Sequence, residues 1–356
     1  MGRKTNLSIS NSELNKFLRK TLLLVIPITI LQVFTFSYYS PDKGDLLRIG
    51  CLLDKFPEYR KIFEPDFSKK YLVLSVRNIS KDSKYDLLTI GDSFSEQGTI
   101  GFQNQIALSS DLKVVHVDRS FHKNQIQALL GMVNSDFFEE YSFDFVLLEF
   151  IEAGTRDISF YINPNFFFNT SDFKIALEED PENSFTKRFL FPSDRLIKFP
   201  YFWLKRVASP EMDSNEVYSL LLKEEEFSVN DKMLWFHASD PNSVNNSDEE
   251  EINFLNELLN TLSEKLGEKG VKLIVLPVAD KLDYYFESLE DSRGFQKTQF
   301  FELLGDMDKK YIYIDSYKIL KSNGQGKKDI FFYDDTHWSP RGTKIIADEI
   351  ILRIRK

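Results

Sequence analysis

Residues 85–95 read YDLLTIGDSFS, and this stretch decides the fold. Its first six residues form a compact apolar run, which predicts a buried strand. Gly91 ends the run and permits a tight turn. Residues 96–108 then have the composition of a helix. A buried strand that leads through a turn into a helix is the repeating unit of a parallel sheet.

The same pattern recurs along much of the chain. Because strands buried on both faces alternate with helices, we expect an α/β fold with a mainly parallel sheet. Further strands are predicted at residues 71–76, 113–117, 143–150, 271–278 and 311–314, and helices at residues 125–133, 252–266 and 343–355. The core would comprise residues 85–150 and 251–356.

Residues 151–250 interrupt this alternation. They are rich in Phe, Asn, Ser and acidic residues and show few strand signals, so we expect an insertion of irregular and helical structure, its role unassigned. Residues 214–225 are a helix candidate. Residues 242–251 (NSVNNSDEEE) are predicted to be a solvated loop that caps the next helix.

An apolar segment near the N-terminus predicts a membrane anchor. Residues 21–39 read TLLLVIPITILQVFTFSYY and carry no charge, and about 19 helical residues cross most of a ~30 Å hydrocarbon layer. Basic residues precede the segment, which predicts a cytoplasmic N-terminus and an exported body. We expect residues 1–40 to form a tail and a single transmembrane helix in a bacterial inner membrane, and residues 41–84 a stalk. A cleaved signal peptide and a buried helix are the alternatives.

Charge and cysteine content exclude several classes. Residues 1–40 hold five of the 45 basic and one of the 55 acidic residues, which leaves the rest of the chain with a net charge of −14. This negative charge disfavours binding to the phosphate backbone of nucleic acids. The single cysteine excludes an intramolecular disulfide framework and a Cys-cluster zinc site. The sequence has no phosphate-binding loop and no HExxH motif, so we expect neither a cofactor nor a catalytic metal.

Ser93 is the candidate nucleophile. It lies directly after a predicted strand, where a parallel sheet presents its ligand-binding edge. Free backbone N–H groups at the start of the next helix would stabilise an anion there. A serine whose attack creates an oxyanion suits such a place.

A serine hydroxyl needs a base, and His337 is the best of the four histidines. It lies in the loop YDDTHWSPRG before the last helix. We prefer Asp334 as the carboxylate that orients His337, because a carboxylate three residues earlier folds back beside the ring in a turn; Asp335 is the alternative. His116 and His237 read as packing residues, and His122 is a weak candidate.

GDSFS near the start of the core and DDTHWSPRG near its end resemble the SGNH (GDSL-type) hydrolase superfamily. The closer resemblance is to its membrane-associated branch, the alginate O-acetylation proteins and related polysaccharide O-acyltransferases, which residues 272–285 and Trp338 also resemble. The resemblance implies a flavodoxin-like three-layer α/β/α sandwich, with Ser93 as nucleophile, His337 as base and Asp334 as orienter.

The chain departs from the family pattern at the oxyanion hole. No Gly follows the second core strand, and no Gly-x-Asn follows the third. Donors beyond the Ser93 amide are therefore unassigned, and Arg156 and Trp338 are the candidates for an oxyanion or substrate contact.

Three functions are compatible with these residues. The first is a membrane-anchored serine enzyme that transfers acyl groups to an envelope or secreted polysaccharide, beside a multi-spanning membrane protein that donates the acyl group. The second is a carbohydrate esterase that uses the same residues with water as acceptor. The third is a non-catalytic module that binds glycan through its aromatic surface.

Overall fold

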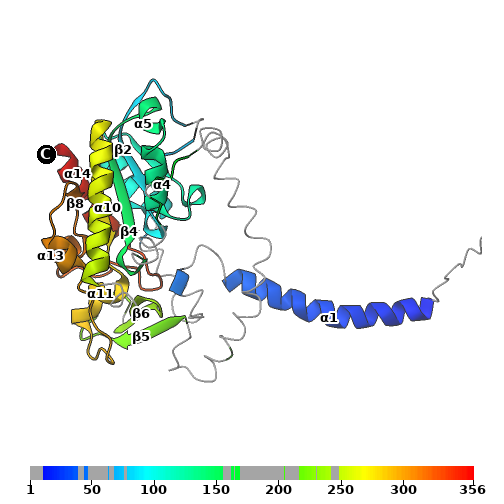
Figure 1. The fold of residues 1–356 in the computed structure, drawn as a ribbon. Helices are drawn as coiled ribbons and strands as arrows, with labels where there is room; N and C mark the ends of the chain where they lie inside the picture. Colours follow the sequence, from blue (N-terminus) through cyan, green and yellow to red (C-terminus); the bar gives the residue numbers. More distant parts are fainter. Residues whose placement is uncertain are drawn as a thin grey trace, which may run out of the picture.

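A computed structural model gives the arrangement of the chain (Figure 1). The structure describes residues 11–38, 44–46, 63, 68–75, 78–154, 162–163, 165–168, 204, 216–229, 231–241 and 248–356. Within α1, the side chains of residue 32 and residues 34–38 are outside this description.

A parallel sheet of six strands forms the centre of the body. Its strands are β1 (Leu72–Val73), β2 (Lys84–Ile90), β3 (Val114–Val117), β4 (Ser142–Ile151), β7 (Lys272–Val278) and β8 (Ile312–Tyr313). They lie in the order β1-β3-β2-β4-β7-β8. From β3 onward this is the order of a flavodoxin-like sheet, whose ligands bind at the carboxyl ends where the chain direction switches, between β2 and β4.

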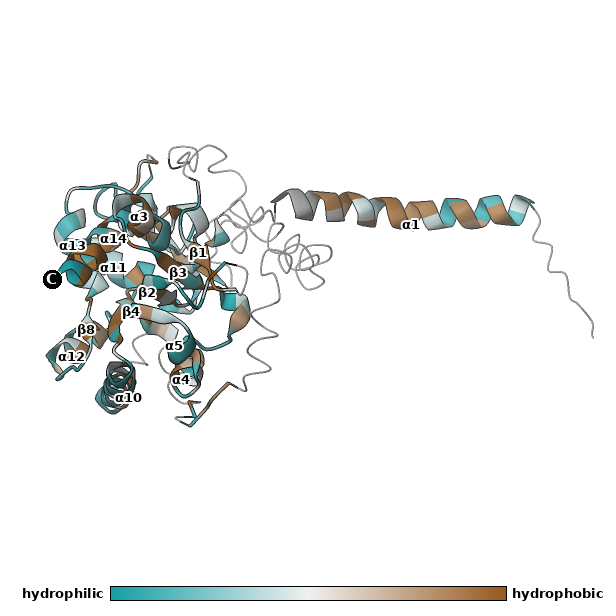
Figure 2. Cartoon of the chain, turned by 90° about the horizontal axis from the view of Figure 1, so that it is seen from above, coloured by the Kyte–Doolittle hydropathy of each residue, from teal (hydrophilic) through white to brown (hydrophobic). Residues whose placement is uncertain are grey.

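Helices cover both faces of the sheet (Figure 2). Their apolar residues divide into two buried clusters, one on each side of the sheet, as the strands alternate in side-chain direction. One face carries α3 (Phe102–Ser109), α13 (Ser316–Gly324) and α14 (Pro340–Arg355), and the other carries α4 (Gln125–Val133), α10 (Glu249–Glu268) and α12 (Phe300–Asp306). The predicted α/β fold with a mainly parallel sheet is confirmed.

Residues 216–241 form an antiparallel pair rather than the predicted helix. β5 (Val217–Leu221) pairs with β6 (Met233–His237). The helix predicted over residues 214–225 is wrong, because Val217 and Leu220 bury their side chains in the same core cluster as β6. Tertiary packing here overrides the helical propensity of the Leu- and Glu-rich sequence.

Part of the predicted stalk belongs to the body. β1 extends the sheet by pairing with β3. Leu46 is fully buried and Phe63 nearly so, both in the core cluster that includes α14. The described residues of this stretch therefore belong to the core and the sheet, whereas the sequence predicted a juxtamembrane stalk. The polar run before α10 does supply the expected cap, since Asp248 accepts a hydrogen bond from the Glu250 amide at 2.8 Å.

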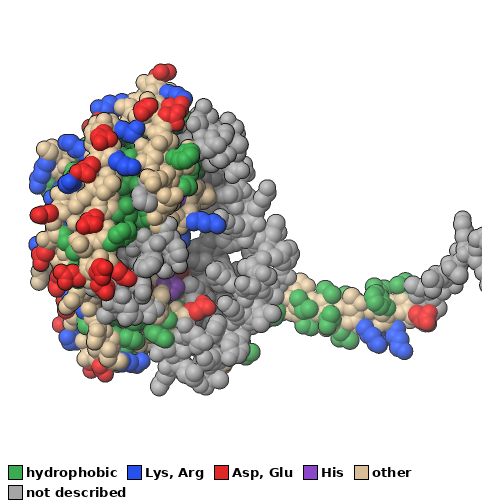
Figure 3. Space-filling view, in the orientation of Figure 1, with side chains coloured by type: hydrophobic (Ala, Val, Ile, Leu, Met, Phe, Trp, Pro, Cys, Tyr) green, Lys and Arg blue, Asp and Glu red, His purple; other side chains and the backbone are tan. Residues whose placement is uncertain are grey.

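The N-terminal helix α1 (Asn11–Tyr38) exposes its described apolar side chains. Hydrophobic groups run along it and basic groups gather toward its N-terminal end (Figure 3). Among the described residues, no helix is both long enough and apolar enough to cross a membrane. Tyr39, the last residue of the predicted anchor, lies outside the described residues.

Candidate active site

Ser93 lies in a tight turn at the carboxyl end of β2. It is the first residue of the 3-10 turn η2 (Ser93–Ser95). The Asp92 side chain braces this turn, because Oδ1 accepts from the Phe94 amide at 2.9 Å and Oδ2 accepts from the Ile151 amide at 2.7 Å. Asp92 thus ties the end of β2 to the end of β4. The Ser93 side chain is half-buried and makes no hydrogen bond within the part of the chain described.

The expected helix does not start directly after Ser93. A second 3-10 turn, η3 (Gly98–Ile100), follows η2, and α3 begins only at Phe102. Gly98 has φ +59°, a left-handed conformation that breaks a regular helix at this point. The start of a full helix is therefore displaced from the serine by two turns.

A buried glutamate lies under the Ser93 turn. Glu149 Oε2 accepts from the Asp92 amide at 3.0 Å and from the Ser95 hydroxyl at 2.7 Å. A Cβ on Gly91 would lie 2.2 Å from that same oxygen, so only glycine fits between β2 and Glu149. Burial, followed by the charge of Asp92, raises the pKa of Glu149 well above its usual range.

His337 lies in a loop that closes on itself. The Phe332 amide donates to the His337 carbonyl at 3.1 Å, and Phe331 and Trp338 form an antiparallel bridge. At the end of this loop Ser339 caps α14, where its hydroxyl accepts from the Arg341 amide at 3.0 Å. The cap fixes the loop against the start of a long helix.

Asp335, rather than the preferred Asp334, contacts the imidazole. Asp335 Oδ1 lies 2.5 Å from His337 Nδ1 and also accepts from the His337 amide at 3.0 Å. Because one carboxylate oxygen binds both the amide and the ring of His337, the turn spans two residues. The three-residue turn expected for Asp334 does not form. Asp334 is buried, and its charge acts on Lys281.

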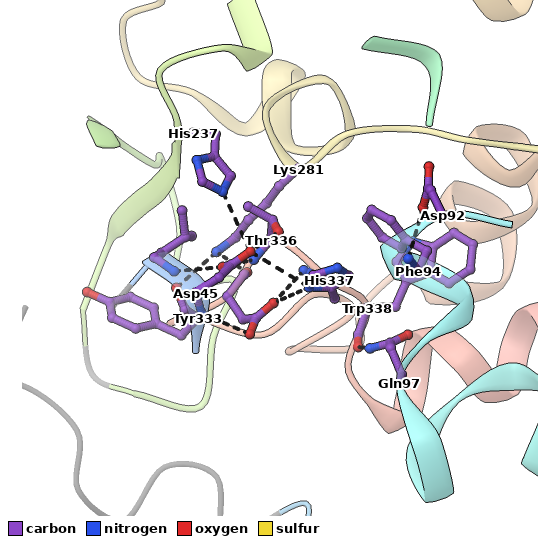
Figure 4. Close-up of polar contacts among 12 residues, drawn as sticks. Asp45, Asp92, Phe94, Gln97, His237, Lys281, Tyr333, Thr336, His337 and Trp338 are labelled. Atoms are coloured by element: carbon purple, nitrogen blue, oxygen red, sulfur yellow. Dashed lines mark hydrogen bonds and ion pairs between the residues drawn. The ribbon is translucent and has the colours of Figure 1, made fainter. Parts of the chain in front are cut away.

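A second acid–imidazole pair adjoins the first (Figure 4). Asp45 Oδ2 lies 3.8 Å from His337 Nδ1 and 3.6 Å from His237 Nε2. Burial opposes protonation of His237, but Asp45 and then Asp240 outweigh it and raise its pKa to about 9. His237 is therefore a charged partner of Asp45, whereas the sequence predicted a packing residue.

A buried lysine holds the backbone of the His337 loop. Lys281 is completely buried in α11 (Lys281–Tyr285), and its Nζ donates to the carbonyls of Tyr333 at 2.9 Å and Asp335 at 3.1 Å. Burial lowers the pKa of Lys281 to about 7, against the raising effect of Asp334, Asp45 and Asp335. These two hydrogen bonds fix the backbone on both sides of Asp334.

The serine turn and the histidine loop meet. The Phe94 and His337 rings have centroids 4.8 Å apart, and Gln97 Nε2 donates to the Trp338 carbonyl at 2.7 Å. Figure 4 shows Phe94 and Gln97 beside the His337 loop. Two segments from opposite ends of the core therefore adjoin at the carboxyl edge of the sheet.

His337 has one ring nitrogen engaged and the other buried without a partner. Nδ1 contacts Asp335, and Nε2 makes no hydrogen bond among the described residues. Burial would lower the pKa of His337, but Asp335, Asp45 and Asp92 raise it above its usual value. A ring held at Nδ1 by a carboxylate presents Nε2 as the group that exchanges a proton.

The other predicted residues occupy different places. Trp338 is fully buried against Phe94, and its Nε1 has no hydrogen-bond partner among the described residues, so its role as an oxyanion or substrate contact stays a prediction. Arg156 lies outside the described residues. His116 is a core histidine as predicted, with Nδ1 3.0 Å from the Thr89 hydroxyl. Burial lowers the pKa of His122 to about 4, so this ring is neutral.

Within the described residues, two groups of side chains have the donor atoms to hold a metal ion. The first group consists of Asp45, Asp335 and His337. Asp45 already binds the Thr336 hydroxyl, and Asp335 and His337 bind each other. The second group lies at the carboxyl ends of β4 and β7. Burial raises the pKa of Glu152 there well above its usual range, and the charges of Asp283 and Asp280 raise it further. Its members are Glu152, Asp280 and Asp283.

Comparison with known proteins supports the resemblance inferred from the motifs. Residues 231–356 match a family model described as "SGNH hydrolase-like domain, acetyltransferase AlgX". The matched part contains the His337 loop and does not include Ser93. No curated protein and no solved structure matches the chain. The predicted resemblance to the alginate O-acetylation branch of the SGNH hydrolases is therefore confirmed, and residues 231–356 are similar to the SGNH hydrolase-like domain of the acetyltransferase AlgX.

Proposed function

We propose that this protein is a serine acyl-transfer enzyme of the O-acetyltransferase type, which acts on an envelope or secreted polysaccharide. One observation carries the proposal: the turn with Ser93 adjoins a histidine whose Nδ1 binds Asp335 and whose Nε2 has no partner among the described residues. These features support the assignment of Ser93 as nucleophile, His337 as base and Asp335 as orienting acid.

The reaction follows from these roles. The Ser93 hydroxyl attacks the carbonyl carbon of the donor ester as His337 Nε2 takes its proton, and the proton then passes to the departing alcohol. A sugar hydroxyl next attacks the acyl-serine, gives its proton to His337 and restores Ser93. Asp335 stabilises the imidazolium in both halves. With water as the acceptor, the same residues give an esterase.

Membrane anchoring through residues 21–39 is part of the proposal. The support is the run of exposed apolar side chains on α1, of which Leu23 is 75% exposed, and the basic residues that precede it. This arrangement favours a position on a bacterial inner membrane with the body outside the cytoplasm. A multi-spanning membrane protein as acyl donor completes the proposal.

The test uses the full chain in detergent with a serine-directed phosphonate and an acetyl ester. We expect the wild type to be labelled at Ser93 and to cleave the ester, and Ser93→Ala to do neither. Ser120→Ala is the matched control, because Ser120 is exposed in the turn after the neighbouring strand β3. Labelling of Ser93→Ala equal to the wild type would contradict the proposal.

Acceptor choice separates the remaining alternatives. Transfer of acetyl groups to an oligosaccharide that outruns release of acetate supports the transferase, and the reverse ratio supports a carbohydrate esterase. A wild-type protein that binds oligosaccharide but neither labels nor cleaves is the non-catalytic module.

A further inference from the structure

The short segment that follows α1 is built into the active site. A Cβ on Gly44 would lie 2.0 Å from the Asp334 carbonyl oxygen, so the backbone at residue 44 lies directly against the His337 loop. Leu46 is fully buried in the core. Residues 44–46 are therefore held from both sides, and Asp45 between them has a fixed position.

Asp45 binds the two residues that precede His337. Its Oδ1 accepts from the Thr336 amide at 2.9 Å, and its Oδ2 accepts from the Thr336 hydroxyl at 2.5 Å. Its own amide donates to Asp335 Oδ2 at 3.1 Å. Asp335 therefore uses one oxygen for His337 and the other for Asp45, and the carboxylate cannot rotate without losing a bond.

Asp45 also places a second negative charge beside Nδ1 of His337. The distance from Oδ2 to Nδ1 is 3.8 Å, and the Asp45 side chain is 14% exposed, so water screens this charge only in part. Two neighbouring carboxylates would repel one another. His237 faces Asp45 from β6 and offsets part of this repulsion, and Lys281 holds the backbone of the same loop from α11.

We propose that Asp45 is a positioning residue for acyl transfer: it locks Asp335 and Thr336 in place and stabilises the imidazolium that His337 forms. The inference rests on the function proposed above and adds to it that the catalytic histidine is supported by the segment adjoining the predicted anchor. No motif of the sequence points to Asp45, because it lies 290 positions from Asp335.

Histidine NMR on the full chain tests this directly. The chain has four histidines, so each imidazole can be assigned by substitution and titrated. We expect Asp45→Asn, which keeps the shape of the side chain and removes its charge, to lower the pKa of His337. The acid limb of ester cleavage should move to lower pH by the same amount. The rate at the plateau should fall roughly tenfold or more, as part of the 10²–10⁴ that a positioned base contributes.

Two further variants keep the test sharp. Asp231→Asn is the matched control, because Asp231 accepts from the Tyr333 hydroxyl of the same loop at 2.7 Å without contacting the His337 ring. It should leave the His337 titration unchanged. Asp45→Glu retains the charge and should keep the His337 pKa above that of Asp45→Asn, even where its rate is reduced.

The outcomes separate this inference from the proposed function. If the wild type is not labelled at Ser93, the proposed function fails, whatever the titration shows. If the wild type is labelled but Asp45→Asn titrates and reacts as the wild type does, the positioning role is overturned. A rate loss in Asp45→Asn that Asp231→Asn shares, with the His337 pKa unmoved in both, also overturns it, because it reports only loop stability.

Discussion

Gln97 and Trp338 are joined by a hydrogen bond of 2.7 Å between the Gln97 Nε2 and the Trp338 carbonyl oxygen, across 241 positions of sequence. The bond connects the turns that follow Ser93 to the residue directly after His337. It therefore helps to hold the segment of the candidate nucleophile against that of the candidate base.

Loss of this bond should uncouple the two segments. We expect Gln97→Leu to lower the rate of ester cleavage by about tenfold or more, because a small displacement of a general base sharply reduces its efficiency. Unfolding stability should fall by about 1–3 kcal/mol, since the Trp338 carbonyl is left without its donor. Steady-state kinetics and denaturant unfolding measure both. An unchanged rate with reduced stability would show that the bond serves folding alone.

Asp335 and Asp334 should respond differently to the same substitution. Asp335→Asn removes the charge that holds His337 Nδ1, so we expect serine labelling to slow by roughly 10³-fold. Asp334→Asn should cost much less activity, because Asp334 does not contact the ring, although its burial predicts a lower melting temperature. Parallel labelling time courses of the two proteins decide the matter. Greater inactivation by Asp334→Asn would return the orienting role to that residue.

The choice between these two acids shows how far sequence patterns reach. The strands of the parallel sheet and α4 could be predicted because buried strands and amphipathic helices leave a period in the sequence. Ser93 and His337 could be predicted because each follows or precedes a regular element at the ligand-binding edge. The turn geometry that selects Asp335 depends on single dihedral angles, which no period records.

Other features depend on contacts between distant segments. β5 looks helical in isolation and becomes a strand because β6 offers a partner and the core accepts Val217 and Leu220. Asp45 lies in a polar stretch with no motif, and its role follows only from its contacts with Thr336 and Asp335. Tertiary contacts of this kind leave no local trace in the chain.

The pH dependence of activity should reflect the environment of His337. Burial opposes protonation, yet Asp335, Asp45 and Asp92 raise the pKa of His337 above its ordinary value of about 6.5. A general base acts in its neutral form, so activity should rise with pH and reach half its maximum above about pH 6.5. A rate profile of ester cleavage by the wild type measures this midpoint. A midpoint below that of a free imidazole would contradict the assigned environment.

Gly91 should tolerate no side chain. A Cβ there would meet Glu149 Oε2 and the Ser95 hydroxyl at 2.2 Å each, and Glu149 is locked by its bonds to this turn. We expect Gly91→Ala to destabilise the protein by several kcal/mol, more than the usual ~1–3 kcal/mol of overpacking, and to abolish labelling.

Gly267→Ala provides the matched comparison. A Cβ at Gly267 meets nothing within 4 Å, and the residue lies in α10, so alanine should be neutral or stabilise by up to about 1 kcal/mol. Thermal unfolding of both variants gives the contrast. Equal stability of the two would mean that the strand end at Gly91 yields more easily than its contacts indicate.

Because Gly44, Asp45 and Leu46 are packed into the body, the distance between the candidate active site and the N-terminal helix is limited. Asp45 follows Tyr38, the last residue of α1, by seven positions. Seven residues span at most about 25 Å even when fully extended. Asp45 therefore stays close to the end of α1. Under the proposed function, the molecule that gives the acyl group and the one that receives it would both have to reach the site near whatever surface holds the helix.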